Sequence, residues 1–77
     1  MNITMQALSD LGFKIIRSYP YDHFITQIWQ RGNLTIERTF DTSKHYTIES
    51  EEVIIGNISF KLKNFKELVI LDEILNR

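Results

Sequence analysis

The 77-residue chain contains no cysteine, which excludes disulfides and thiolate metal sites. It has only three glycines, too few for a glycine-rich phosphate-binding loop beside the two hairpin turns in which we expect glycine. No apolar run approaches the roughly 18 residues that a membrane-spanning helix needs. The formal net charge of −1 offers no long-range field that would attract DNA. These absences argue against a phosphate-loop enzyme, a membrane protein and a general DNA-binding protein.

The composition is that of an ordinary globular domain, with 43% apolar and 25% charged residues. A chain of this length buries only about 60% of its unfolded surface, so we expect a single small domain over residues 1–77. Domains of fewer than about 80 residues often gain stability from a partner. The first residues show neither a basic region nor a long apolar segment, which predicts no secretory signal and a cytoplasmic location.

The centre of the chain, Phe24 to Ile48, predicts three strands joined by two turns. Gly32-Asn33 stands between two apolar-rich runs, and glycine readily adopts the positive φ of a two-residue hairpin turn. With that turn, Arg31 faces Leu34, Trp29 faces Ile36, Gln27 faces Arg38 and Ile25 faces Phe40. Facing residues share a side of the sheet, so one face is apolar and contains Ile25, Trp29, Leu34, Ile36 and Phe40. The other face is mainly polar and contains Thr26, Gln30, Thr35, Glu37 and Thr39, together with Phe24 and Ile28.

The residues before this hairpin predict a short helix and a strand. Apolar spacing favours a helix over residues 3–11, with Gly12 as its left-handed end. A strand over Phe13–Tyr19 follows, with Phe13, Ile15 and Tyr19 on one side. We expect the strand to end at Pro20, because proline cannot donate a hydrogen bond to a strand ladder.

The segment Tyr19–His23 has two interpretations. Two tyrosines around a proline are compatible with an exposed recognition loop, which makes Tyr19, Tyr21 and His23 candidate protein-binding residues. The more ordinary interpretation is a turn whose rings pack over one end of the core.

The residues after the central hairpin predict a turn at Asp41–Lys44 and an acidic connection at Glu49–Glu52. An odd loop of three or five residues would keep the alternation on the core face. It would pair Phe40 with Tyr46 and Arg38 with Ile48. We expect Glu49–Glu52 to form a solvated loop rather than a metal site.

A second hairpin is predicted around Gly56-Asn57, between Val53–Ile55 and Ile58–Leu62. A two-residue loop pairs Ile55 with Ile58 and Val53 with Phe60. Asn64, followed three residues later by Glu67, then resembles a capping box that opens a helix over Phe65–Asn76.

The last helix has a broad apolar arc on the helical wheel, formed by Phe65, Leu68, Val69, Leu71, Ile74 and Leu75. Ile70 falls outside this arc, near Lys66 and Glu73. The wide stripe is either partly buried against the first helix or a surface for a partner. Ile70 and Glu73 are therefore candidate protein-binding residues.

No arrangement of residues points to catalysis. Asp22 and His23 are adjacent, so in an extended chain their side chains point to opposite sides. No serine stands in a nucleophile elbow, and the two histidines lack metal-ligand spacing. We expect no catalytic, cofactor-binding or metal-binding residue, and hence no enzyme.

One basic cluster, Lys61, Lys63 and Lys66, alternates with Phe60 and Phe65. Aromatic rings among basic side chains can stack on single-stranded nucleic acid. The favoured interpretation is that both rings belong to the core and that the lysines solvate the junction between strand and helix. Nucleic-acid binding through these lysines is the alternative function.

Several short segments resemble small hypothetical proteins encoded by phages and prophages of low-GC bacteria. The likeness consists of a short helix running into Leu11-Gly12-Phe13-Lys14, strands such as Ile36–Phe40 and Tyr46–Ile48, and a final helix with Glu67-Leu68. It covers most of the chain. By analogy it implies a protein that binds and modulates a host or phage protein, and it assigns no functional residue.

Together these observations predict an α+β domain. We expect a short helix, an antiparallel meander of four to six strands and a final helix, with both helices on one face of the sheet. The expected function is non-enzymatic binding of another protein, either a foreign protein or a second copy, through an apolar helix face or a sheet edge.

Overall fold

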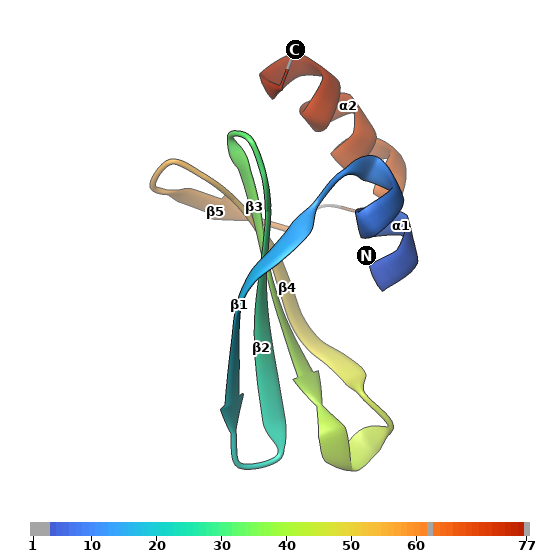
Figure 1. Cartoon of the computed structure of the whole chain (residues 1–77), viewed down its shortest axis with the longest axis vertical. Coiled ribbons are helices and arrows are strands. Elements are labelled where there is room, and N and C mark those ends of the chain that lie inside the picture. The colour runs from blue at the N-terminus through green and yellow to red at the C-terminus, as the bar shows by residue number, and fades with distance from the viewer. Residues whose placement is uncertain (1–3, 62, 77) are drawn as a thin grey trace.

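The computed structural model describes residues 4–61 and 63–76 and has the expected α+β architecture (Figure 1). Its elements are α1 (Met5–Leu11), β1 (Lys14–Tyr21), β2 (Phe24–Arg31), β3 (Leu34–Asp41), the 3-10 helix η1 (Thr42–Lys44), β4 (Thr47–Ile55), β5 (Ile58–Phe60) and α2 (Phe65–Leu75). The five strands form one antiparallel meander in the order β1-β2-β3-β4-β5. Both helices lie on one face of the sheet.

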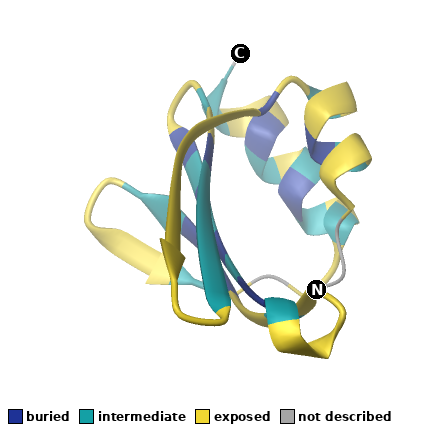
Figure 2. Ribbon diagram, turned by 60° about the horizontal axis from the view of Figure 1, so that its bottom comes forward, coloured by how far each residue is buried: buried dark blue, intermediate teal, exposed yellow. Residues whose placement is uncertain are grey.

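The helices lie at the end of the sheet where β2 turns into β3, and the opposite end extends beyond them (Figure 1). The molecule is accordingly elongated, with extents of 38 × 21 × 21 Å. Buried residues line the strands and helices where the two layers meet, whereas β1 and the β4–β5 turn are exposed (Figure 2).

The central hairpin has the predicted register. Arg31 pairs with Leu34, and the pairing continues without a shift to Phe24 and Asp41. Gly32 has a φ of 56°, the left-handed value that a two-residue hairpin turn requires at this position. The turn type and the apolar alternation specify the same register. A slip of one residue would move the apolar side chains to the other face of the sheet.

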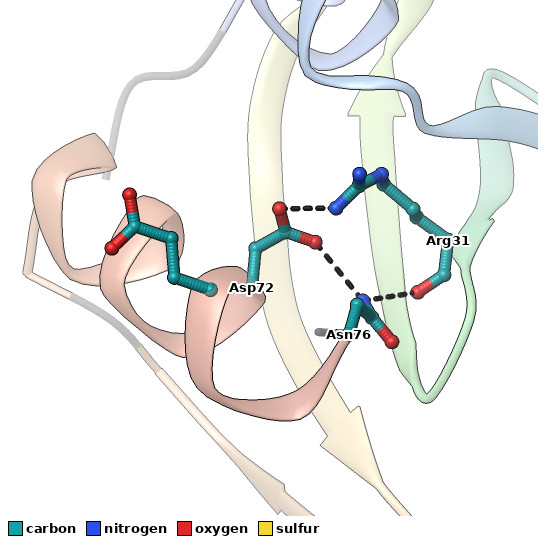
Figure 3. A pocket seen from close by; sticks show the side chains of 4 residues that line it. Arg31, Asp72 and Asn76 are labelled. Carbon is teal, nitrogen blue, oxygen red and sulfur yellow. Dashed lines mark hydrogen bonds and ion pairs between the residues drawn. The ribbon is translucent and has the colours of Figure 1, made fainter.

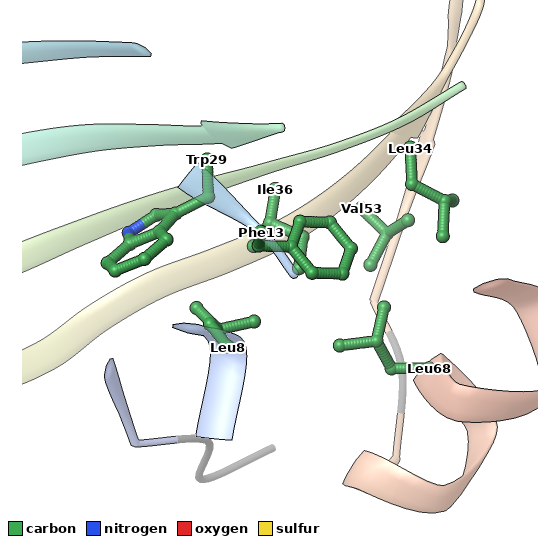
Figure 4. Close-up of a cluster of buried hydrophobic side chains, with 7 residues drawn as sticks. All are labelled: Leu8, Phe13, Trp29, Leu34, Ile36, Val53 and Leu68. Atoms are coloured by element: carbon green, nitrogen blue, oxygen red, sulfur yellow. The ribbon is translucent and has the colours of Figure 1, made fainter. Parts of the chain in front are cut away.

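The core forms where this hairpin meets the two helices (Figure 4). Its buried members are Leu8, Phe13, Trp29, Leu34, Ile36, Val53 and Leu68. The sheet supplies most of these side chains, while α1 contributes Leu8 and α2 contributes Leu68. Each helix therefore anchors one fully buried leucine in the same apolar layer.

Local capping sets the ends of α1. The Thr4 hydroxyl accepts a hydrogen bond from the Ala7 N–H at 3.0 Å and caps the first turn. Gly12 follows the helix with a φ of 106°. The Phe13 N–H then donates to the Leu8 carbonyl at 2.9 Å, the bond that closes a helix before a left-handed glycine. The predicted helix and its end at Leu11 are confirmed, although α1 begins at Met5 and the predicted start at residue 3 lies outside the described residues.

The first strand differs from the prediction in two ways. It continues through Pro20 to Tyr21, and the sheet tolerates proline here because β1 is an edge strand. Its register also shifts between Ile15 and Arg17. This bulge adds one residue to the strand, so Tyr19 lies on the face opposite Ile15, and the prediction that they share a side is wrong.

The turn between β3 and β4 also corrects the predicted register. The loop has five residues, but it spans 42–46, one residue later than the predicted pairing requires, so Phe40 pairs with Ile48 rather than with Tyr46. A register shift between Thr39 and Phe40 then pairs Arg38 with Glu51 rather than with Ile48. Tyr46 leaves the core face and is 63% exposed. The Asp41 carboxylate organises the loop by accepting hydrogen bonds from the Ser43 N–H at 2.9 Å and the Ser43 hydroxyl at 2.6 Å.

The acidic stretch Glu49–Glu52 is not a solvated loop but the middle of β4. Glu51 faces Arg38 across the β3–β4 ladder, and Oε2 of Glu51 lies 2.8 Å from Nε of Arg38. Both residues are buried, with exposed fractions of 8% and 1%. The Arg38 guanidinium also lies 5.0 Å from the centre of the Phe40 ring. A buried ion pair on the core face therefore supports a strand that its composition alone does not favour.

The second hairpin has the predicted register and the last helix begins where predicted, but β5 ends at Phe60 and α2 at Leu75. The predicted end of the strand, Leu62, lies outside the described residues. Ile55 pairs with Ile58 and Val53 with Phe60. The Asn64 side chain accepts a hydrogen bond from the Glu67 N–H at 3.0 Å and begins α2 as a cap. One member of the predicted apolar arc is misplaced, since Ile74 is 60% exposed.

We expect the carboxyl groups of Asp41 and Glu51 to make the free energy of unfolding depend on pH in opposite directions. Hydrogen bonds from Ser43 lower the pKa of Asp41 below its ordinary value of 3.8, so this stabilisation is lost as the pH falls below 3.8 through the folded-state pKa. Burial raises the pKa of Glu51 above its ordinary value of 4.5, despite the attraction of Arg38, so stability is lost as the pH rises from 4.5 through the folded-state pKa. Urea unfolding across this range should show that Ser43→Ala flattens only the acid limb and Glu51→Gln only the upper limb. Equal effects of both variants on both limbs would contradict the assignment.

Candidate binding surface

The structure places the candidate protein-binding residues on two separate surfaces. Tyr19, Tyr21 and His23 lie on β1 and the β1–β2 turn, at the end of the sheet that extends beyond the helices (Figure 1). Ile70 and Glu73 lie on α2, over the other end of the sheet. No single site can therefore use all five residues.

The tyrosines of β1 project from the open face of the sheet. Tyr19 is 47% exposed and Tyr21 is 80% exposed, so neither ring covers the core. The Tyr19 hydroxyl accepts a hydrogen bond from Arg17 at 3.0 Å. The His23 ring lies 4.2 Å from the Phe24 ring, and its Nδ1 lies 3.1 Å from the Asp22 carboxylate. The expectation that Asp22 and His23 point to opposite sides is wrong, because Asp22 lies in a turn with a left-handed φ of 55° and not in an extended chain. The surface is aromatic and exposed, and neither of the two hollows described below includes its residues.

The polar end of α2 is occupied by contacts that dock the helix (Figure 3). Arg31 forms an ion pair with Asp72, which is only 5% exposed. The Asn76 side chain donates to the Arg31 carbonyl at 2.8 Å and accepts from the Asn33 N–H at 2.8 Å. The adjoining hollow, about 320 Å³, is lined by Arg31, Asp72, Glu73 and Asn76. Because most of these groups are engaged with each other, we interpret them as a structural clasp between α2 and the β2–β3 turn.

A second hollow lies between α2 and β5. It measures about 330 Å³, and its lining includes Phe60, Glu67, Ile70 and Leu71. Ile70 is 48% exposed on the wall of this hollow, as its place outside the apolar arc suggested. Ile58 and Ile74, which are 63% and 60% exposed, extend the apolar surface along β5 and along α2. Sequence reasoning singled out Ile70 but missed Phe60 and Leu71, because only the packing of α2 beside β5 brings them together.

The two edges of the sheet are protected to different degrees. Edge strand β1 contains Pro20 and a bulge, both of which discourage pairing with another strand. Edge strand β5, Ile58–Phe60, contains neither device, although its length of three residues limits pairing. Ile58 flanks a two-residue turn and so bonds toward β4, and by the alternation of an antiparallel ladder the backbone N–H and C=O of Ser59 point away from β4. An added strand could bond to Ser59.

The basic cluster lies at the junction between β5 and α2, beside the second hollow. Lys61, Lys63 and Lys66 are all exposed. The two rings that would stack on nucleic-acid bases, Phe60 and Phe65, instead pack against the core cluster. The junction therefore offers positive charge beside a hollow rather than an aromatic stacking surface.

Comparison of the chain with protein-family models, curated proteins and solved structures finds no match. Within residues 4–61 and 63–76, no helix has the length and apolar character needed to cross a membrane. No group of three or more His, Asp or Glu side chains in the same residues is arranged to hold a metal ion.

Proposed function

We propose that this protein is a non-enzymatic, cytoplasmic binding domain that takes up an extended segment of another protein at the hollow between β5 and α2. The observation that carries the proposal is Ile70, a half-exposed isoleucine on the wall of a hollow that adjoins an open sheet edge. Exposed apolar side chains beside an open edge are features of surfaces that bind an added strand. The resemblance to phage and prophage proteins is compatible with such a role.

The size of the surface favours a short segment over a second copy of the chain. The described lining of the hollow is four residues, and β5 is three residues long. A stable interface between folded proteins engages roughly 20–30 residues on each side. In the proposed complex, one apolar side chain of the partner enters the hollow against Phe60 and Leu71, while its backbone pairs with Ser59.

The test is a variant that places a charge on the wall of the hollow. Ile70→Asp should abolish binding of peptides selected from a phage-displayed random library against the wild-type protein, because a carboxylate would be desolvated there without a partner. Its free energy of unfolding should change by only about 0.5 kcal/mol, as for other surface substitutions. Peptide binding is measured by fluorescence polarisation and stability by urea unfolding.

The matched control is Ile16→Asp, which changes an isoleucine of similar exposure, 51%, on the opposite edge of the sheet. It should leave peptide binding unchanged. Selected peptides that bind Ile70→Asp as well as wild type would contradict the proposal, and so would an unfolded Ile70→Asp protein, which would place Ile70 in the core. Concentration-dependent dimerisation in light scattering, lost only in Ile70→Asp, would show instead that the partner is a second copy.

A further inference from the structure

The charges around the hollow bear on the chemistry of its occupant. Lys61 directly follows Phe60, and Lys66 lies one helical turn before Ile70, so both stand at the same end of the hollow. Lys63 lies between them, at the start of α2. Because the amino-terminal end of a helix carries a partial positive charge, α2 adds to the positive potential of the three lysines.

These lysines differ from three other cations among the described residues. Arg31 pairs with Asp72, Arg38 with Glu51, and Lys44 approaches Asp41 and Glu49. Among the described residues, no ion pair involves Lys61, Lys63 or Lys66.

Among the described residues that line the hollow, the one carboxylate, Glu67, has a local role. Glu67 Oε1 accepts a hydrogen bond from the Lys63 backbone N–H at 3.0 Å, and its own N–H is bound by the Asn64 cap. The Glu67 carboxylate is thus directed toward the start of α2. The junction between β5 and α2 therefore has three positive side chains and one negative side chain. The junction keeps a positive excess although the whole chain has a net charge of −1.

We propose that the segment bound between β5 and α2 is acidic, with an apolar side chain in the hollow and Asp or Glu residues beside it that face Lys61, Lys63 and Lys66. The inference rests on the proposed function, because it specifies the partner of the same surface. Apolar contact provides the anchor, and the carboxylates provide orientation and faster association. A segment with the opposite charge is disfavoured by the same lysines.

The experiment compares peptides selected from the random library against the intact protein. We expect enrichment of Asp and Glu next to an apolar residue. The charge-reversal variant Lys61→Glu/Lys63→Glu/Lys66→Glu should weaken the best peptides by about 10-fold or more at low salt, and added salt should reduce the difference. The variant should fold, since acidic residues are favourable near the start of a helix.

The outcomes separate this inference from the proposed function. Peptides that depend on Ile70 but show no acidic enrichment, and that tolerate charge reversal, overturn the inference and leave the proposed function in place. If no selected peptide loses affinity for Ile70→Asp or for the milder Ile70→Ala, both the inference and the proposed function are overturned. A fluorescein-labelled oligothymidine that binds more tightly than any selected peptide, and is released by charge reversal, would overturn the acidic segment in favour of nucleic acid.

Discussion

Glu51→Ala is expected to lower the free energy of unfolding by about 3–5 kcal/mol, the usual loss when one partner of a buried ion pair is removed. The variant leaves the Arg38 guanidinium in a site where it is 1% exposed, without the Glu51 oxygen that lies 2.8 Å from its Nε. A protonated Glu51 still offers that oxygen to Arg38, whereas alanine offers none. Burial already lowers the pKa of Arg38, which shows that its charged form is disfavoured there even with Glu51 present. Because small domains have total stabilities of about 5–15 kcal/mol, urea unfolding should show a large shift or a protein unfolded at room temperature.

The double variant Arg38→Met/Glu51→Leu is the control for this prediction. It removes both charges and keeps the apolar volume, so its stability should return to within about 1 kcal/mol of wild type or exceed it. Arg38→Met alone should lose less stability at acidic pH than at neutral pH, because the buried Glu51 carboxyl can then take up a proton. A double variant as unstable as Glu51→Ala would show that the site requires the ion pair itself.

Gly32→Ala is expected to lower the free energy of unfolding by about 2–4 kcal/mol. The left-handed conformation, with a φ of 56°, accounts for about 1–2 kcal/mol. A Cβ at this position would also lie 2.1 Å from Oδ1 of Asn76, so the Asn76 side chain must leave its place between Arg31 and Asn33. Each hydrogen bond lost in this way contributes a further 0.5–1.5 kcal/mol or so. Urea unfolding measures the change.

Gly56→Ala provides a matched control from the second hairpin. Gly56 has nearly the same φ, 61°, but no atom lies within 4 Å of the added Cβ. Gly56→Ala should therefore lower the free energy of unfolding only by the cost of the left-handed conformation, about 1–2 kcal/mol. In an Asn76→Ala background the two glycine variants should become equal. Equal losses in the wild-type background would show that Asn76 does not hold α2 on the β2–β3 turn.

Sequence patterns predicted the features that neighbouring residues control. The register of the central hairpin follows from Gly32 and the alternation around it, because a turn of defined length and an apolar face each allow only one alignment. The start of α2 follows from Asn64 and Glu67, whose contact spans three residues. The half-exposed position of Ile70 was visible as a departure from the apolar arc of its own helix.

Features that depend on contacts between distant residues were not predictable in this way. The composition of Glu49–Glu52 indicates a solvated loop, and only the presence of Arg38 on the neighbouring strand makes Glu51 part of a buried ladder. Asp72 belongs to a polar clasp because Arg31 lies opposite, 41 residues earlier in the chain. The bulge in β1 likewise moved Tyr19 to the open face.

For the candidate site, the sequence by itself determined which side chains are apolar and which are basic, and where β5 and α2 begin. Only the tertiary structure decided that Phe60 and Ile70 share one hollow and that the tyrosines of β1 do not. The physical reason is that turns and caps are determined by contacts over a few residues. A hollow depends instead on the relative position of two elements, and the packing of the whole core sets that position.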